Sequence, residues 1–464
     1  MKVKPSLTEG PIPKVLLLFS LPVLFGNVLQ TLNGSVNAIW VGRYLGEAAL
    51  TATSNANLLM FLLLGAVFGV SMAATILVAQ HVGAKELAEA RRITGASATF
   101  FLMLSLLTSV LGFAFTPALL SLLHTPHDAV PYALAYMRII FVALPFMYGF
   151  FFVMAVLRGA GDSKTPFIFL ALSVVLDIAL NPLLIFGFGP VPRLGIAGSA
   201  TATLIGQSVS LTALLTYLYR SRHFLWIGRA DWHLFRVDWR IVRVLILKGL
   251  PMGLQMIVVS SSMLVMLTFV NRYGSQVTAA FAAAMQLWSY VQMPALALSA
   301  SVSSMAAQNV GAGRWDRVGK IATTGIVFNF LMSGTLIAVL YLLNRHALSL
   351  FLPPGGEALD VAAHINATVV WSFALFGVTM VLFGVVRATG ATLPPLLLLF
   401  VSLWLVRIPL ALLLQQRYGA EGVWWSFPAA SVVSMLLAIG YYRYGAWRSA
   451  RMEEPRSGPL AWDQ

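Results

Sequence analysis

Long apolar segments recur along the whole chain, separated by shorter segments that carry most of the charged residues. Each segment is about 20 residues or longer, the length that an α-helix needs to cross a bilayer. A lipid-facing backbone must satisfy its own hydrogen bonds, so the segments are expected to be helices. The pattern predicts an all-α integral membrane protein with twelve transmembrane helices. The expected spans are 14–42, 48–80, 93–122, 131–157, 165–188, 195–220, 241–270, 276–310, 320–343, 361–387, 394–414 and 420–443.

The two halves of the chain resemble each other. Residues 79–84 (Ala-Gln-His-Val-Gly-Ala) return at 307–312 as Ala-Gln-Asn-Val-Gly-Ala, an offset of 228 positions. Leu21-Pro22 returns as Leu250-Pro251, an offset of 229. A repeat of this size in an apolar chain predicts two pseudo-symmetric six-helix lobes, an architecture that favours alternating access around a shared cavity.

The repeat divides the chain into an amino-terminal lobe, a linker, a carboxyl-terminal lobe and a tail. The expected boundaries are 1–220, 221–240, 241–444 and 445–464. The linker mixes Asp231, Asp238 and several Arg with Trp residues. We interpret it as a connector at the membrane interface, where Trp is common; the alternative is lipid-headgroup contact or regulation.

Composition and charge agree with a membrane protein. Hydrophobic residues make up 59% of the chain and charged residues 10%, against roughly 25% charged in a soluble domain. The net charge is +14, and the Lys and Arg residues are unevenly distributed. If each loop is numbered by the span that it follows, the odd-numbered loops and their helix ends hold few of the 30 Lys and Arg. These few are Arg43, Arg138, Arg193, Arg272, Arg345 and Arg417. The asymmetry places both termini in the cytoplasm and explains the charge without nucleic-acid binding.

Several functional classes are disfavoured. The sequence shows no Gly-rich phosphate loop and no His/Glu metal cluster, so we expect no enzyme activity, no ATP hydrolysis and no cofactor. The absence of cysteine excludes disulfides and thiolate metal sites. No short apolar segment with a small-residue cleavage site precedes the first span, so we expect no removable signal peptide.

Asp177 is the one acid that falls near the middle of a predicted span. Ionisable groups in the membrane are costly and are functional candidates by default. Asn181 lies at i+4 on the same helix face. Pro182 donates no hydrogen bond, which frees a backbone carbonyl. This turn therefore offers a carboxylate, an amide oxygen and a carbonyl to a proton or a hard cation. The alternative is a structural Asp satisfied by neighbouring hydroxyl and amide groups.

A polar stripe on the first span supports a functional site. Its members lie within about a third of the helix circumference: Asn27, Gln30, Asn33 and Asn37. The stripe is interpreted as the wall of a wet cavity, with helix–helix packing as the alternative. Pro22 is expected to act as a hinge in this helix, as Pro182 does in the fifth. Thr203 of the sixth span can present its hydroxyl toward the same region.

The second half has no matching acid. The Asp177 region maps onto Trp404–Pro409, where Arg407 is the only charge. Arg407 can pair with carbonyls or a lipid phosphate, or extend to the interface, and the sequence does not choose. Met285 and Gln286 lie among aromatic residues that suit a soft pocket wall. With Gln30 and Asn33 they form the expected substrate cavity, although packing is the alternative for such stripes.

The chain resembles the MATE family, the multidrug and toxic compound extrusion transporters. The resemblance covers roughly residues 12–445. It rests on Leu21-Pro22, 41–50 (VGRYLGEAAL), 79–83 (AQHVG), 157–166 (LRGAGDSKTP), 181–187 (NPLLIFG) and 195–203 (GIAGSATAT). It implies two six-helix lobes in the bacterial plasma membrane. It also implies export of organic, often cationic, drugs or toxic metabolites in exchange for inward H⁺ or Na⁺. We expect a monomer.

Within the family, the chain is similar to the bacterial branch whose cation site lies in the amino-terminal lobe. That resemblance assigns coupling to Asn37, Asp177, Asn181 and Thr203. The chain departs from the branch: Asn37 replaces the first-helix Asp, and the fifth-helix Asn and Asp stand in reversed order. One carboxylate remains. Because burial favours the protonated carboxyl, we expect H⁺ rather than Na⁺, with Na⁺ at Asp177 as the only metal alternative.

Three other functions compete with drug antiport. A lipid-linked oligosaccharide flippase of a related two-lobe fold is the first alternative, but it would favour a cationic cavity, and only Arg407 is expected to be buried. A membrane transferase would need a cluster of acids or His at one membrane face, and none is evident. A channel fits the repeated halves poorly.

Overall fold

The computed structural model describes residues 7–45, 47–123, 125–187, 189, 192–353 and 355–452. These residues are nearly all helical, and no strand occurs among them. The first half contains α1 (Ile12–Leu45), α2 (Glu47–Gly83), α3 (Leu87–Leu122), α4 (Val130–Gly159), α5 (Lys164–Phe186) and α6 (Ile196–Arg220). A short 3-10 helix, η1 (Arg229–Phe235), connects them to the second half.

The second half repeats this order with two interrupted helices. It contains α7 (Trp239–Asn271), α8 (Ser275–Gly311), α9 (Trp315–Leu348), α10 (Glu357–Val369), α11 (Ser372–Ala388), α12 (Leu393–Phe400), η2 (Val401–Arg407), α13 (Ile408–Tyr418), α14 (Ala420–Tyr444) and η3 (Ala446–Ser449). Counting α10–α11 and α12–η2–α13 as one rod each, the described residues form twelve rods.

The two interruptions differ from the expected straight spans. The span expected at 361–387 is bent by 47° between α10 and α11. The span expected at 394–414 contains η2, a π-helical turn. Pro409 follows that turn and has no N–H to donate to the carbonyl of Leu405, which favours a local departure from α-helical bonding.

Most rods suit a membrane by length and composition. In the described part of the chain, ten helices are long and apolar enough to cross a bilayer, and the bent pair raises this to eleven. The remaining rod is α8, which is equally long but more polar. It packs against α2, α9 and α11, and many of its residues are buried. The polar side chains near its carboxyl-terminal end therefore face protein: Ser299, Ser301, Ser303, Ser304, Gln308 and Asn309. The prediction of an all-α, twelve-helix membrane protein is confirmed.

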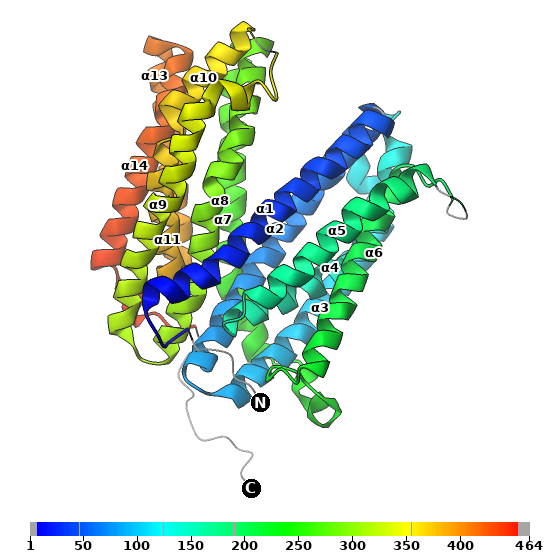
Figure 1. The fold of residues 1–464 in the computed structure, drawn as a ribbon, viewed down its shortest axis with the longest axis vertical. Coiled ribbons are helices and arrows are strands. Elements are labelled where there is room, and N and C mark those ends of the chain that lie inside the picture. Colours follow the sequence, from blue (N-terminus) through cyan, green and yellow to red (C-terminus); the bar gives the residue numbers. More distant parts are fainter. Residues whose placement is uncertain are drawn as a thin grey trace.

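The helices form two groups, α1–α6 and α7–α14, which diverge toward one end and come together at the other (Figure 1). The end at which the two groups come together carries η1 and is called the linker end. There α2 packs against α7 and α8, while α1 packs against α8 and α9. These contacts join the two lobes.

A reciprocal pair of hydrogen bonds closes the linker end. Gln80 of α2 donates its Nε2 to the carbonyl of Ala388, at 2.7 Å. Gln308 of α8 donates its Nε2 to the carbonyl of Gly159, at 2.8 Å. A Cβ at Gly83 would collide with the backbone of Gln308, and one at Gly311 with the backbone of Gln80. The two copies of the repeated segment, 79–84 and 307–312, thus meet between the lobes. This contact of α2 with α8 is called the cross-lobe contact below.

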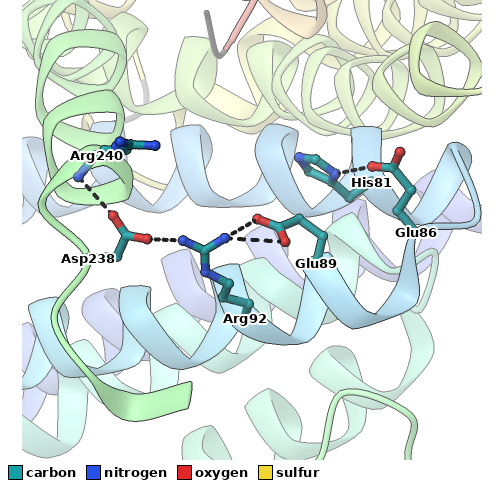
Figure 2. A network of polar contacts seen from close by, with 6 residues as sticks. All are labelled: His81, Glu86, Glu89, Arg92, Asp238 and Arg240. Atoms are coloured by element: carbon teal, nitrogen blue, oxygen red, sulfur yellow. Dashed lines mark hydrogen bonds and ion pairs between the residues drawn. The ribbon is translucent and has the colours of Figure 1, made fainter. Parts of the chain in front are cut away.

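The linker is held against α3 by ion pairs. Arg92 bonds Glu89 at 3.1 Å and also pairs with Asp238, whose carboxylate accepts the N–H of Arg240 at the start of α7 (Figure 2). Arg91 pairs with Asp231 at 2.6 Å. Both linker acids are therefore engaged by protein, in keeping with the connector interpretation.

Candidate functional site

The ends of α5 fix the position of its polar face. The carboxylate of Asp162 accepts the first free N–H groups of the helix, from Lys164 at 3.1 Å and Thr165 at 3.0 Å. Gly187 ends the helix with a φ of +75°, a conformation that favours glycine. Gly206 of α6 allows close approach, since a Cβ there would lie 3.3 Å from the carbonyl oxygen of Ser173. This packing brings α6 to the polar face of α5.

Asp177 lies where α1, α5 and α6 meet. It is 4% exposed. Asn33 of α1 donates its Nδ2 to Asp177 Oδ2 at 2.8 Å. Thr203 of α6 donates its hydroxyl to Asp177 Oδ1 at 3.0 Å. Each carboxylate oxygen thus accepts one hydrogen bond from a different neighbouring helix. No ion pair in the described part of the chain reaches this carboxylate.

Two buried amide oxygens beside the carboxylate lack partners. Asn181 donates its Nδ2 to the backbone carbonyl of Asp177 at 2.9 Å, and its Oδ1 has no partner among the described residues. The Oδ1 of Asn33 is also buried without a described partner. Buried polar atoms are normally hydrogen-bonded. The Asp177 site (Asn33, Asp177, Asn181, Thr203) therefore offers one carboxylate and two free neutral oxygens.

Asn37 occupies a neighbouring position. Its Oδ1 accepts the Ser199 hydroxyl at 2.7 Å, while the buried Tyr136 lies close to both Asn37 and Asp177. Ser199 is also linked to the Asp177 site, because its carbonyl accepts the Thr203 hydroxyl at 3.4 Å. Sequence reasoning missed both hydroxyl residues. Ser199 carried a weak signal, since it lies one turn before Thr203 on the same face.

The residues expected around a substrate cavity are less closely grouped. Asn33 donates a hydrogen bond to Asp177, so it belongs to the Asp177 site. Gln30 is exposed on α1 and Gln286 is half-buried on α8, two helices that pack together. Met285 packs against an apolar cluster of the second lobe. The helices α1 and α5 continue through Pro22 and Pro182.

A second charged position lies in the other lobe. Arg407 is 7% exposed, and its guanidinium carbon lies 4.0 Å from the ring centroid of Phe427. The expectation that only Arg407 is buried was wrong, because Arg387 is 8% exposed. Arg387 bonds Gln255 Oε1 at 3.2 Å and Ser299 Oγ at 2.8 Å. Its motif lies at the end of α11, and the partners Gln255 and Ser299 come from other helices, so sequence position alone did not reveal the burial.

The described residues contain no group of three or more His, Cys, Asp or Glu that could hold a metal ion. At the sequence level, the model of the family described as MatE matches two segments, 22–183 and 251–413. The chain belongs to the MATE family. The two matched segments of this MATE protein fall one in each half, as the internal repeat predicts. Family membership makes it a multi-pass membrane transporter rather than an enzyme.

Relatives and solved structures agree along the whole length. The "Probable multidrug resistance protein YoeA" of Bacillus subtilis is 37% identical, with 97% of this MATE chain and 96% of the relative covered. A "FAD transporter" of Shewanella oneidensis is 27% identical over 95% and 96% of the two chains. An outward-facing multidrug resistance MATE transporter superposes with a TM-score of 0.89 at 19% identity, covering 97% and 100%. The Vibrio cholerae transporter VcmN in the bent form gives 0.85 at 20%, covering 94% and 97%. These structures share the two-lobe fold.

Proposed function

We propose that this MATE protein is a secondary active multidrug exporter, which moves organic, often cationic, compounds out of the cell in exchange for an inward cation. The observation that carries the proposal is the Asp177 site. A single buried carboxylate, held by hydrogen-bond donors on two other helices, suits reversible binding of one positive charge. The relatives named multidrug resistance proteins support export of small molecules over the flippase alternative.

Cation binding at this site would change the contacts of α1. The Asn33 amide and the Thr203 hydroxyl donate to an ionised carboxylate. A protonated Asp177 accepts fewer hydrogen bonds and can itself donate to the free Oδ1 of Asn33 or Asn181. Because α1 also packs against α8 and α9 of the other lobe, such a change reaches the junction between lobes. Differential affinity for the two access states then couples the ion to the substrate.

We propose H⁺ as the coupling ion and Na⁺ as the alternative. Loss of water around a carboxyl group favours its protonated form. Na⁺ would use the carboxylate with neutral oxygens from Asn33, Asn181 and Thr203, but such a site has only one full negative charge. Asn37 carries an amide where the family branch has a second acid, which makes a Na⁺ site weaker still.

The coupling ion is tested with purified protein in proteoliposomes. Uptake of a fluorescent cationic dye is driven by an imposed pH gradient without Na⁺, and separately by a Na⁺ gradient at equal pH with a protonophore present. We expect transport under the first gradient only. Transport under the Na⁺ gradient alone would assign coupling to Na⁺. Transport under neither gradient would reject antiport by this protein.

The arrangement in the cell follows from the same proposal. We propose that residues 1–220 and 241–444 are the two moving units, that 221–240 connects them, and that 445–464 is a tail. Both termini lie in the cytoplasm of a monomer in the bacterial plasma membrane. The relative named a FAD transporter shows that relatives of this chain are not all named for cationic drugs, because FAD carries phosphate groups.

A further inference from the structure

We propose that Arg407 forms an anion-binding site in the carboxyl-terminal lobe, which receives the carboxylate or phosphate group of a transported amphipathic compound. The proposal rests on the transport function above and adds a substrate class to it. Three helices supply the site: Arg407 ends η2, Met263 lies on α7 and Phe427 on α14. We call these three residues the Arg407 site.

The Arg407 site occupies the place in its lobe that the Asp177 site occupies in the other. Arg407 lies 229 positions after Ile178, the neighbour of Asp177. Met263 lies 229 positions after Gly34, the neighbour of Asn33. Phe427 lies on the last rod of its lobe, as Thr203 does. The two lobes thus build the same three-helix junction around charges of opposite sign.

The guanidinium of Arg407 has no described partner that balances its charge. Its Nη2 lies 3.6 Å from Met263 Sδ, a weak acceptor. Its Nε is buried and has no hydrogen-bond partner among the described residues. The group lies 4.0 Å from the ring centroid of Phe427, which attracts a cation but accepts no strong hydrogen bond. Most of the donors of Arg407 therefore have no strong acceptor among the described residues and are available to a ligand.

The acids of this lobe do not serve as counter-ions. They are Asp316, Glu357, Asp360 and Glu421. Asp360 pairs with Arg345 at 2.8 Å, and Glu421 lies 2.6 Å from His364. Glu357 accepts a hydrogen bond from Gln276 at 3.1 Å. Asp316 lies in the first turn of α9. No acid among the described residues pairs with Arg407, so we infer that the partner of this buried charge comes from outside the chain.

The guanidinium of Arg407 favours ligands with a carboxylate or phosphate group. A planar guanidinium binds carboxylate and phosphate oxygens through two parallel hydrogen bonds, and the stacked ring fixes its plane. Burial strengthens such a bond because water does not compete for it. Arg407 also lies in a π-helical turn, an element that is frequent at functional sites. An apolar body with one anionic group would match the ring, the thioether and the guanidinium together.

The proposal is tested with two dyes that share the xanthene ring system, anionic fluorescein and cationic rhodamine 6G. Binding to the purified full-length protein in neutral detergent is followed by fluorescence polarisation. In Arg407→Met we expect the fluorescein affinity to fall about tenfold, and the rhodamine 6G affinity to stay within about twofold. Arg407→Lys keeps the charge but loses the two parallel donors of the guanidinium, so we expect the affinity to fall about threefold for fluorescein alone.

Phe427→Leu provides a second test if Arg407→Met does not fold, as judged by its thermal unfolding midpoint. It retains the charge and should weaken fluorescein binding about threefold through loss of the stacked plane. Equal losses for both dyes in the folded variants would make Arg407 a packing residue and overturn the proposal. Unchanged fluorescein binding, or no fluorescein binding by the unaltered protein, would also overturn it.

A lipid headgroup carries the same chemistry as an anionic substrate. Phosphatidylglycerol added to the detergent distinguishes the two sources. Displacement of fluorescein by micromolar phosphatidylglycerol in the unaltered protein, with no fluorescein uptake in proteoliposomes, would assign the site to lipid and overturn the substrate proposal. Fluorescein uptake that Arg407→Met abolishes supports it. If Arg407-dependent binding occurs, phosphatidylglycerol does not displace fluorescein and no ion gradient drives either dye, antiport fails and the anion site stands.

Discussion

At the residue scale, we propose that Asp177 decides whether transport is coupled. Asp177→Asn keeps the shape of the side chain and removes its charge, and no second acid lies near the middle of a predicted span to replace it. We expect gradient-driven dye transport to be lost, with a thermal unfolding midpoint close to that of the unaltered protein. Asp360→Asn is the matched control, because its exposed carboxylate pairs only with Arg345 at the surface. Full transport by Asp177→Asn would reject the coupling role.

Substitutions at Thr203 distinguish a hydrogen-bonding role of its hydroxyl from a packing role of its side chain. It donates to Asp177 Oδ1, so Thr203→Val removes one hydrogen bond while preserving volume. A bond to a charged group contributes about 1.5–3 kcal/mol, so we expect coupled transport to fall by about tenfold or more. Thr203→Ser should keep at least a third of the rate, because it retains the donor. Initial rates at several imposed pH gradients measure both variants, and equal loss in Val and Ser would indicate packing.

At the element scale, the cross-lobe contact depends on two glycines. A Cβ at Gly83 or Gly311 would overlap the backbone of the opposing Gln308 or Gln80. We therefore expect Gly83→Ala and Gly311→Ala to separate α2 from α8 and to lower transport about tenfold or more. Gly334→Ala is the control, since a Cβ at that helical position meets nothing within 4 Å. Dye transport and the unfolding midpoint are measured together; unaffected transport in all three variants would show that this contact is not needed.

Substitutions in the linker should affect stability and transport far less than substitutions in the cross-lobe contact. Its ion pairs join Arg91 to Asp231 and Arg92 to Asp238, and all four side chains keep some exposure to solvent. Exposed pairs contribute about 0–1 kcal/mol each. We expect Asp231→Asn and Asp238→Asn each to lower the unfolding midpoint by only a few degrees and to leave dye transport unchanged. Loss of transport in a folded variant would point to a regulatory linker.

At the scale of the whole molecule, substrate selection and ion coupling should separate. We propose that the substrate path lies between the lobes and includes Gln30, Met285 and Gln286, on α1 and α8. Replacing each with Ala should change the relative rates for a panel of cationic and neutral drugs, by about threefold or more, because each contact favours some shapes over others. The dependence on the pH gradient should persist. Uniform loss for every drug, or no change for any, would remove these residues from the path.

Much of this architecture could be predicted from the sequence. Hydropathy fixed the number and approximate limits of the rods, since each span must meet the thickness of the bilayer. The internal repeat defined two lobes, because equivalent sequences fold into equivalent bundles. Asp177 stood out because a charge is costly in hydrocarbon wherever neighbouring helices lie. The resemblance to the MATE family likewise rested on short local motifs of the sequence.

Only the tertiary structure decided which side chains meet. Asn33, rather than Asn37, donates to Asp177, since the rotation of α1 against α5 is set by packing across helices. Tyr136 and the exchange between Gln80 and Gln308 come from segments far apart in sequence, so no local pattern reported them. The bend between α10 and α11 and the burial of Arg387 depend likewise on neighbours. Sequence determines what each helix can bury, and packing determines what each buried group contacts.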